Sequence, residues 1–277
     1  MKLYIIIIIL IALLLVGLLC HRYYMYKYYR YRFLNLVLFS TEKPEYIEMY
    51  NLTRRFYKKY TNVDTVYYTY SENIDQDFYD HNSNILYIKG KESRIPGILD
   101  KTIKAFKYCL SYFDYKKYDY IVRTNISTIV NFDRLSYLLY SNSSHYAGGF
   151  KWTIDPDYID KESGIVDDRY SGLEYCSGTC IIFSRELFRK MLERADYFDR
   201  EVIDDVSIGY LIKEYFPEYK LDIFDEYFLF TDDIYDIYDI DNTYAIKEIC
   251  NEYIFFRNNS GDRDKDVSIM KKIINQL

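Results

Sequence analysis

The pattern of hydrophobic positions begins with one unbroken apolar run at the N-terminus. Tyr4–Cys20 reads YIIIIILIALLLVGLLC, without a charge or a proline, and about 17 such residues is the lower limit for a helix that spans a bilayer. Lys2 and a group of tyrosines supply interfacial anchors at its two ends. These tyrosines are Tyr23, Tyr24, Tyr26, Tyr28 and Tyr29. The pattern predicts an uncleaved transmembrane signal-anchor helix over 1–20 and a basic, Tyr-rich juxtamembrane segment over 21–33. A cleaved signal peptide is the alternative, but Gly17 is the one small residue near a cleavage point.

After the apolar run, hydrophobic stretches of strand type alternate with stretches of helical spacing. The expected strands cover 35–39, 63–70, 84–89 and 118–122. The expected helices cover 44–60, 98–113, 185–195 and 206–215. Strands separated by helices of this length predict βαβ units and a mostly parallel, Rossmann-like sheet. We therefore expect one α/β domain over 34–277, with a ligand site beyond the carboxyl ends of the strands, just after Val122.

Charge is distributed unevenly between the two parts of the chain. No acidic residue occurs before Glu42, and five of the 36 Lys and Arg fall in the first 32 residues. The remainder has 31 basic against 42 acidic residues, a net charge of −11, which disfavours a nucleic-acid partner. The basic stretch favours contact with a lipid membrane. The positive-inside rule places the domain tentatively on the cytosolic side, with a lumenal domain as the alternative.

Three segments carry polar residues at positions where an α/β domain places its ligands. They are Tyr120–Leu135, Cys176–Leu187 and Asp204–Gly209. Together they resemble the β-1,3-galactosyltransferase and Fringe group of glycosyltransferases. The resemblance is closest to a variant subgroup, several of whose members come from large DNA viruses, in which Arg-Thr-Asn-x-Ser replaces an acidic triplet. It implies a GT-A-like nucleotide-diphospho-sugar transferase fold. The implied reaction moves a sugar from a nucleoside diphosphate sugar to a hydroxyl of a glycan or protein acceptor, with inversion.

The resemblance also implies roles for individual residues. It makes Asp205 the catalytic base, with Asp204 beside it where the motif has Glu, and Trp152, Ser177 and Gly178 acceptor-binding residues. The implied donor-binding residues are Arg123, Thr124, Asn125, Ser127, Glu92, Lys101, Arg257 and Arg263. Each residue has a structural alternative. Asp204 or Asp205 would serve as a helix N-cap, and Trp152 as a core residue. Glu92 and Lys101 would form an ion pair that supports the donor site, or would simply face solvent.

The acidic triplet of the family is absent from this chain. Asn125, Ile126 and Ser127 stand in its place, so no carboxylate is present there to hold a divalent cation. Fixed Arg side chains are another way to neutralise a leaving diphosphate, and Arg123, Arg257 and Arg263 are candidates. The expected ligand is a nucleotide-sugar donor, and a divalent metal cofactor is doubtful. The histidines and cysteines show no zinc-ligand spacing.

Two other functions remain open at the level of the sequence. The missing acidic triplet would suit a catalytically inactive protein that binds a nucleotide or a glycan. If the motif matches are accidental, the chain would be a membrane-anchored interaction or scaffold protein. The segment 231–242, which repeats Asp-Ile-Tyr, is interpreted as a solvated low-complexity insert rather than a metal-binding strip.

Overall fold

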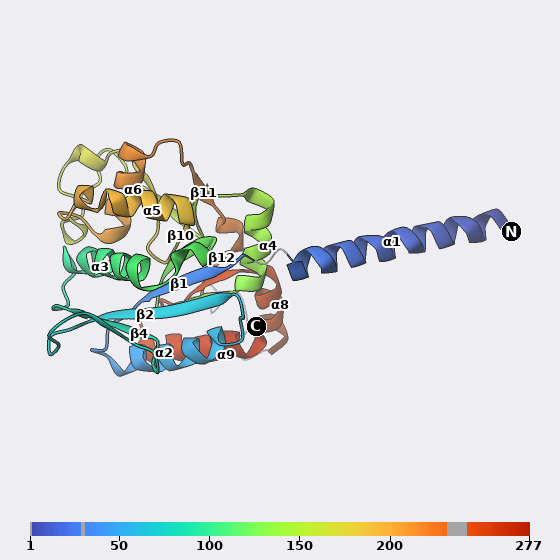
Figure 1. The fold of residues 1–277 in the computed structure, drawn as a ribbon, viewed down its shortest axis with the longest axis horizontal. Coiled ribbons are helices and arrows are strands. Elements are labelled where there is room, and N and C mark those ends of the chain that lie inside the picture. The colour runs from blue at the N-terminus through green and yellow to red at the C-terminus, as the bar shows by residue number, and fades with distance from the viewer. Residues whose placement is uncertain (1, 29–30, 232–242) are drawn as a thin grey trace.

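The computed structural model describes residues 2–28, 31–231 and 243–277. Helix α1 covers Lys2–Tyr28, and Figure 1 shows it extending away from the folded domain. Its side chains are described at Tyr4 and over 7–20. Among the described residues, no helix is both long and apolar enough to cross a membrane. The Asp-Ile-Tyr repeat lies almost entirely outside the described residues.

An eight-stranded mixed sheet forms the centre of the domain (Figure 1). Its strands are β1 (Phe33–Leu38), β2 (Val63–Ser71), β3 (Phe78–Asp80), β4 (Ile85–Lys89), β5 (Tyr120–Asn125), β7 (Tyr146–Gly148), β10 (Cys180–Ser184) and β11 (Leu221–Ile223). Their order is β11-β7-β10-β5-β1-β2-β4-β3. The central strands β5, β1, β2 and β4 are parallel, β10 runs antiparallel to both of its neighbours, and β3 is an antiparallel edge. The carboxyl ends of β1 and β5 therefore meet at one edge of the sheet.

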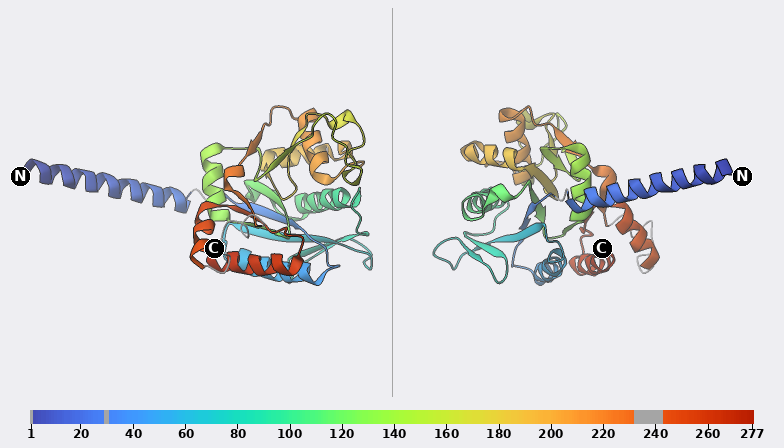
Figure 2. Two further views of the ribbon diagram at one scale, coloured as in Figure 1. Left: turned by 180° about the vertical axis from the view of Figure 1, so that it is seen from behind. Right: turned by 45° about the vertical axis from the view of Figure 1, so that its right-hand side comes forward.

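Helices cover both faces of this sheet (Figure 1). They are α2 (Pro44–Tyr57), α3 (Gly97–Tyr112), α4 (Phe132–Asn142), α5 (Arg185–Glu193), α6 (Asp204–Tyr215), α8 (Thr243–Glu252) and α9 (Arg263–Gln276). The apolar sides of α3, α5 and α6 pack on one face around Phe106, Phe188 and Leu211. The opposite face carries α2 and α9, which lie side by side in both views of Figure 2.

Two smaller sheets complete the domain. One joins β12 (Phe228–Phe230), β13 (Phe255–Arg257) and β6 (Thr128–Val130), so that the C-terminal part of the chain pairs with the segment directly after β5. The other is the antiparallel pair of β8 (Lys151–Thr153) and β9 (Glu174–Cys176). The three-stranded sheet belongs to the hydrophobic cluster on the face of α2 and α9, to which Ile129 and Phe255 contribute.

The prediction of an α/β domain with a largely parallel central sheet is confirmed, and the eight expected elements are present within a few residues of their expected bounds. The sequence pattern did not reveal the three-stranded sheet or α9. Their strands and helix make contacts with segments far away in the chain, such as α2 with α9, and no local periodicity encodes such contacts.

Candidate functional site

Strand β5 continues further than the hydrophobic pattern predicted. It ends at Asn125 rather than at Val122, because Arg123, Thr124 and Asn125 each pair in register with a residue of β1. Side chains alternate along a strand, so Arg123 and Asn125 face the side that carries α6. Thr124 points the other way, is fully buried, and donates its hydroxyl to Asn35 Oδ1 at 3.4 Å. Thr124 thus lines no described cavity.

Arg123 is the centre of a buried polar network. Its Nη2 donates to Asp204 Oδ2 at 2.6 Å, its Nη1 donates to Asn125 Oδ1 at 2.9 Å, and Nη1 also contacts the carbonyl oxygen of Gly178. The side chain is 1 % exposed. Burial by itself lowers the pKa of Arg123, but Asp204, Tyr68 and Asp205 together outweigh the effect of burial and raise that pKa. The pair therefore ties β5, the loop at Gly178 and the first turn of α6 together.

Asp205 lies beside this ion pair at the start of α6. Its Oδ2 accepts the backbone N–H of Gly178 at 2.8 Å, and its Oδ1 accepts that of Val206 at 3.0 Å. Burial and the neighbouring Asp204 carboxylate raise the pKa of Asp205 to about 6, while the Gly178 N–H and Arg123 oppose the rise. A carboxylate with a pKa near neutrality is suited to take up and release a proton.

Neither aspartate is the N-cap of α6. The cap position is Ile203, and it makes no side-chain capping bond. Asp204 and Asp205 occupy the first two helical positions and direct their oxygens at Arg123 and at Gly178 instead. The capping interpretation is thus wrong, because the buried Arg123 cation competes successfully for the Asp204 carboxylate.

Two cavities lie at the carboxyl edge of β1 and β5 and share four lining residues, Leu38, Ile98, Asn125 and Arg257. One, of 240 Å³, contains Asp205. Its other polar lining residues are Arg94, Arg123, Ser177, Gly178, Thr179 and Asp204. The other cavity, of 220 Å³, holds the remaining predicted donor residues. These are Glu92, Lys101, Ser127 and Arg263, with Tyr46 and Ser40 beside them.

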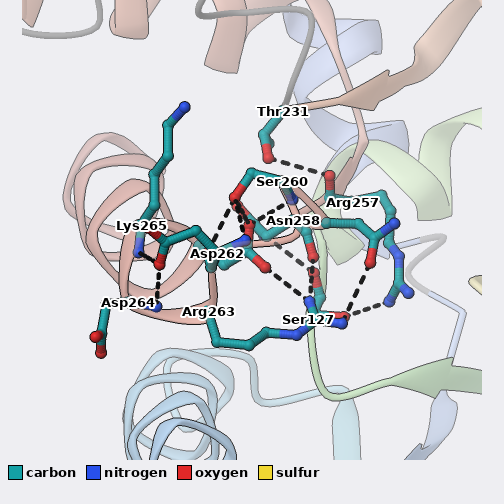
Figure 3. Close-up of polar contacts among 11 residues, drawn as sticks. Ser127, Thr231, Arg257, Asn258, Ser260, Asp262, Arg263, Asp264 and Lys265 are labelled. Carbon is teal, nitrogen blue, oxygen red and sulfur yellow. Dashed lines mark hydrogen bonds and ion pairs between the residues drawn. The ribbon is translucent and has the colours of Figure 1, made fainter.

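Arg257 lines both cavities. It ends β13, and its guanidinium donates to the hydroxyl of Ser127 (Figure 3). No described carboxylate lies within ion-pair distance of Arg257, whereas the neighbouring Arg263 pairs with the buried Asp266 at 2.7 Å. Burial lowers the pKa of Arg257 to about 10, and the nearby cations Arg263 and Arg123 add to this effect. Arg257 remains charged at neutral pH and is therefore a cation without a counter-ion in the described protein.

Lys101 is a further buried cation at this edge. Its Nζ lies 2.6 and 2.7 Å from the two carboxylate oxygens of Glu92 and 3.3 Å from the carbonyl oxygen of Phe39. Burial lowers the pKa of Lys101, and Glu92 counteracts the shift. The ion pair that the sequence suggested is therefore present at a cavity wall rather than in solvent.

The three predicted acceptor residues separate into two places. Ser177 and Gly178 line the cavity with Asp205. A Cβ at position 178 would lie 2.9 Å from Arg123 Nη1 and 3.2 Å from Asp205 Oδ2, so glycine permits this close approach. Trp152 is on β8, is 53 % exposed, and lines none of the described cavities. It is neither a core residue nor part of the wall around Asp205.

The side chains of Asn125, Ile126 and Ser127, which stand where the resemblance expects an acidic triplet, do not fit a divalent cation. The Asn125 amide oxygen already accepts from Arg123, Ile126 is apolar and buried, and the Ser127 hydroxyl accepts from Arg257. Hard cations need several free oxygen ligands. In the described part of the chain, no group of three or more His, Cys, Asp or Glu is arranged to hold a metal ion.

Polar groups without a partner also lie at the cavity of Asp205. Arg123 Nε and Thr179 Oγ1 are buried and have no hydrogen-bond partner among the described residues. Such orphaned groups are uncommon in native proteins and point to a missing ligand or water. The sequence pattern did not indicate Thr179 or Arg94 as residues of the site. An Arg in a surface loop and a Thr before a strand carry no distinguishing sequence signal.

Comparison with known proteins gives a similarity to solved structures but no match to a family model or a curated sequence. Among solved structures, the chain is similar to the crystal structure of a glycosyltransferase involved in the glycosylation of the major capsid of PBCV-1. The two share 10 % sequence identity and a TM-score of 0.44, over 87 % of this chain and 99 % of the other. That identity is too low to transfer an activity.

Proposed function

We propose that the protein is a glycosyltransferase that moves a sugar from a nucleoside diphosphate sugar to a hydroxyl acceptor. One observation carries the proposal. At one edge of the sheet, a carboxylate with a raised pKa lines the same cavity as a cation that has no counter-ion among the described residues. Asp205 and Arg257 line the same 240 Å³ cavity. The motif resemblance in the sequence assigns the same residues to the same reaction.

In this proposal Asp205 is the general base of a single displacement. With a pKa of about 6, the carboxylate is mostly ionised at neutral pH and remains a competent proton acceptor. The acceptor oxygen attacks the anomeric carbon while its proton passes to Asp205. The bond from that carbon to the diphosphate oxygen breaks with its electron pair leaving on the diphosphate. Attack from the face opposite to the leaving group inverts the anomeric configuration.

The growing negative charge of the diphosphate is balanced by arginine in this proposal. Among the described residues, the Arg257 guanidinium has one hydrogen-bond partner, the Ser127 hydroxyl. Planar guanidinium groups bind phosphate oxygens in a bidentate way. Lys101 and Arg263 line the adjoining cavity, where they add to the positive potential although each is paired with a carboxylate. We propose that these fixed cations replace a divalent metal.

Membrane attachment through 1–20 and a cytosolic orientation of the domain are further parts of the proposal that rest on the sequence. They are supported by the uncharged run Tyr4–Cys20 and by the basic residues that follow it. Neither is needed for the chemistry at Asp205.

A thermal-shift screen tests the proposal. The full chain in detergent is melted with a panel of nucleoside diphosphates and nucleotide sugars, each with and without manganese. A ligand at about 100 times its dissociation constant stabilises the fold by about 2.7 kcal/mol, so one nucleotide class should raise the melting temperature without manganese. A shift without any turnover would favour a non-catalytic nucleotide-binding protein, and the absence of any shift would overturn the proposal.

A further inference from the structure

The segment between β8 and β9 packs against the start of α6, the helix that carries the proposed base. Residues 151–174, called the acceptor rim below, run from the start of β8 to the start of β9, and β9 leads directly into Ser177 and Gly178. The middle of the rim is attached to the residue before α6, because the Ile203 N–H donates to the Ser163 carbonyl oxygen at 3.0 Å. Its Glu162 also pairs at 2.8 Å with Arg94, which lines the cavity of Asp205.

The acceptor rim has a small hydrophobic core of its own. Ile154, Ile165, Tyr170 and Leu173 are buried and cluster with residues at the start of α6. This packing, together with the attachment at Ser163, fixes the rim relative to the proposed base. Whatever the rim binds is therefore held at a defined position relative to Asp205.

The outer surface of the rim exposes large apolar side chains. Trp152, Tyr158, Ile159 and Val166 are 53 %, 47 %, 53 % and 59 % exposed, respectively. Several exposed apolar residues on one short segment are typical of a surface that binds another molecule. The two aromatic rings would suit a sugar or a polypeptide. The aliphatic Ile159 and Val166 offer neither a hydrogen bond nor a ring face to a sugar, and they favour a polypeptide.

Charge on the rim indicates what kind of polypeptide fits. The rim contains seven acidic and three basic residues, a net charge of −4. Asp155, Asp157 and Asp168 are exposed and have no ion-pair partner among the described residues. Asp155 and Asp157 stand between the exposed Trp152 and Tyr158 in the sequence. Carboxylates without an ion-pair partner therefore alternate with exposed apolar side chains along this part of the rim. Charge complementarity across an interface steers and selects a partner of the opposite sign.

We infer that the acceptor hydroxyl is carried by a polypeptide in which basic residues accompany apolar ones, and that this polypeptide docks on the acceptor rim. The inference rests on the proposed function, since it names the substrate class for the hydroxyl that Asp205 deprotonates. The two cavities at the carboxyl edge of β1 and β5 have the opposite charge, with five cations and three carboxylates among their lining residues. The donor and the acceptor are thus separated by the sign of their charge.

A peptide selection followed by a binding measurement tests this inference. The full chain in detergent is incubated with a randomised pool of serine-centred peptides, and the captured peptides are sequenced. Lys, Arg and apolar residues should be enriched, and Asp and Glu depleted. A synthetic peptide of the enriched composition should then bind the double variant D155K/D157K about tenfold more weakly or worse, measured by fluorescence anisotropy.

A matched variant controls for the change in net charge. D196K/E226K reverses two exposed carboxylates outside the rim, and its peptide affinity should stay as in the wild type. The nucleotide-induced melting shift should be the same in all three proteins. Captured peptides without a charge preference, an equal loss of affinity in both double variants, or no capture of any peptide would overturn the inference. The proposed function would survive those results, because it is tested separately by the nucleotide-induced melting shift and by turnover.

Discussion

The substitution Asp205→Asn separates the proposed catalytic role of this residue from a structural one. In the folded protein the pKa of Asp205 is raised from 3.8 to about 6. The folded state therefore binds more protons than the unfolded state between about pH 4 and pH 6. Stability consequently falls as the pH rises through that interval, and the full cost of ionising the buried carboxylate is present above pH 6.

The size of this cost follows from the pKa shift. A rise of about 2.2 pH units corresponds to about 3 kcal/mol. The favourable interaction of a carboxylate with the helix N-terminus is smaller, about 0.3–1 kcal/mol, so burial determines the sign. An asparagine at position 205 is neutral and can still accept the Gly178 N–H. The variant should thus be more stable than the wild type by about 3 kcal/mol at pH 7, or roughly 6–12 °C in melting temperature for a chain of this size.

Melting curves at pH 4 and pH 7 provide the assay. The stability advantage of D205N should be near zero at pH 4 and appear in full at pH 7, while sugar transfer falls about 10²–10⁴-fold, as expected for loss of a general base. If D205N is less stable than the wild type at both pH values by the same amount, Asp205 stabilises the start of α6 and the reasoning is refuted.

Three other substitutions test the remaining parts of the site. Arg257→Met should weaken binding of the nucleoside diphosphate about 10–100-fold in calorimetry, because a charged hydrogen bond is worth about 1.5–3 kcal/mol. Arg257→Lys should retain part of the affinity, and equal affinities of the wild type and Arg257→Met would remove Arg257 from the donor site. Arg123→Met should lower the unfolding free energy by about 3–5 kcal/mol in denaturant melts, since it leaves the Asp204 carboxylate buried and unpaired. Asp204→Asn added to that variant should restore part of the loss, and additive losses would contradict the pairing. Gly178→Ala should reduce kcat about tenfold or more with little change in donor KM, because the Cβ of the new alanine would displace Arg123 and Asp205. An unchanged kcat would show that the loop tolerates a side chain at position 178.

The elements that the sequence predicted correctly are those with strong local patterns. The apolar positions of α3 recur at helical spacing, and the run before Ser40 is short, apolar and bounded by polar residues. Such patterns reflect burial on one face of a helix or in a central strand. Nothing in the local sequence marks the pairing of β13 with β6, because residues 255–257 and 128–130 are far apart in the chain.

The candidate site was predicted in its composition but not in its geometry. Eleven of the thirteen acceptor, donor and catalytic candidates line the two adjoining cavities, and Arg123 is among them although its charge is neutralised by Asp204. Thr124 and Trp152 line neither cavity, because Thr124 faces the other side of β5 and Trp152 is exposed on β8. The local sequence does not show which face of a strand meets the cavity. Whether Asp204 caps α6 or pairs with Arg123 depends on a contact between two residues that are 81 positions apart, and no local pattern encodes that contact.

Sugar transfer in the presence of a metal chelator tests the central claim most directly. The full chain is given the nucleotide sugar identified by melting and a serine-containing peptide, and release of the nucleoside diphosphate is measured with and without EDTA, in the wild type and in D205N. We expect equal turnover in the wild type with and without EDTA, and a loss of turnover in D205N under both conditions. Turnover that is abolished by EDTA and restored by manganese would contradict the assignment of arginine as the group that stabilises the leaving diphosphate.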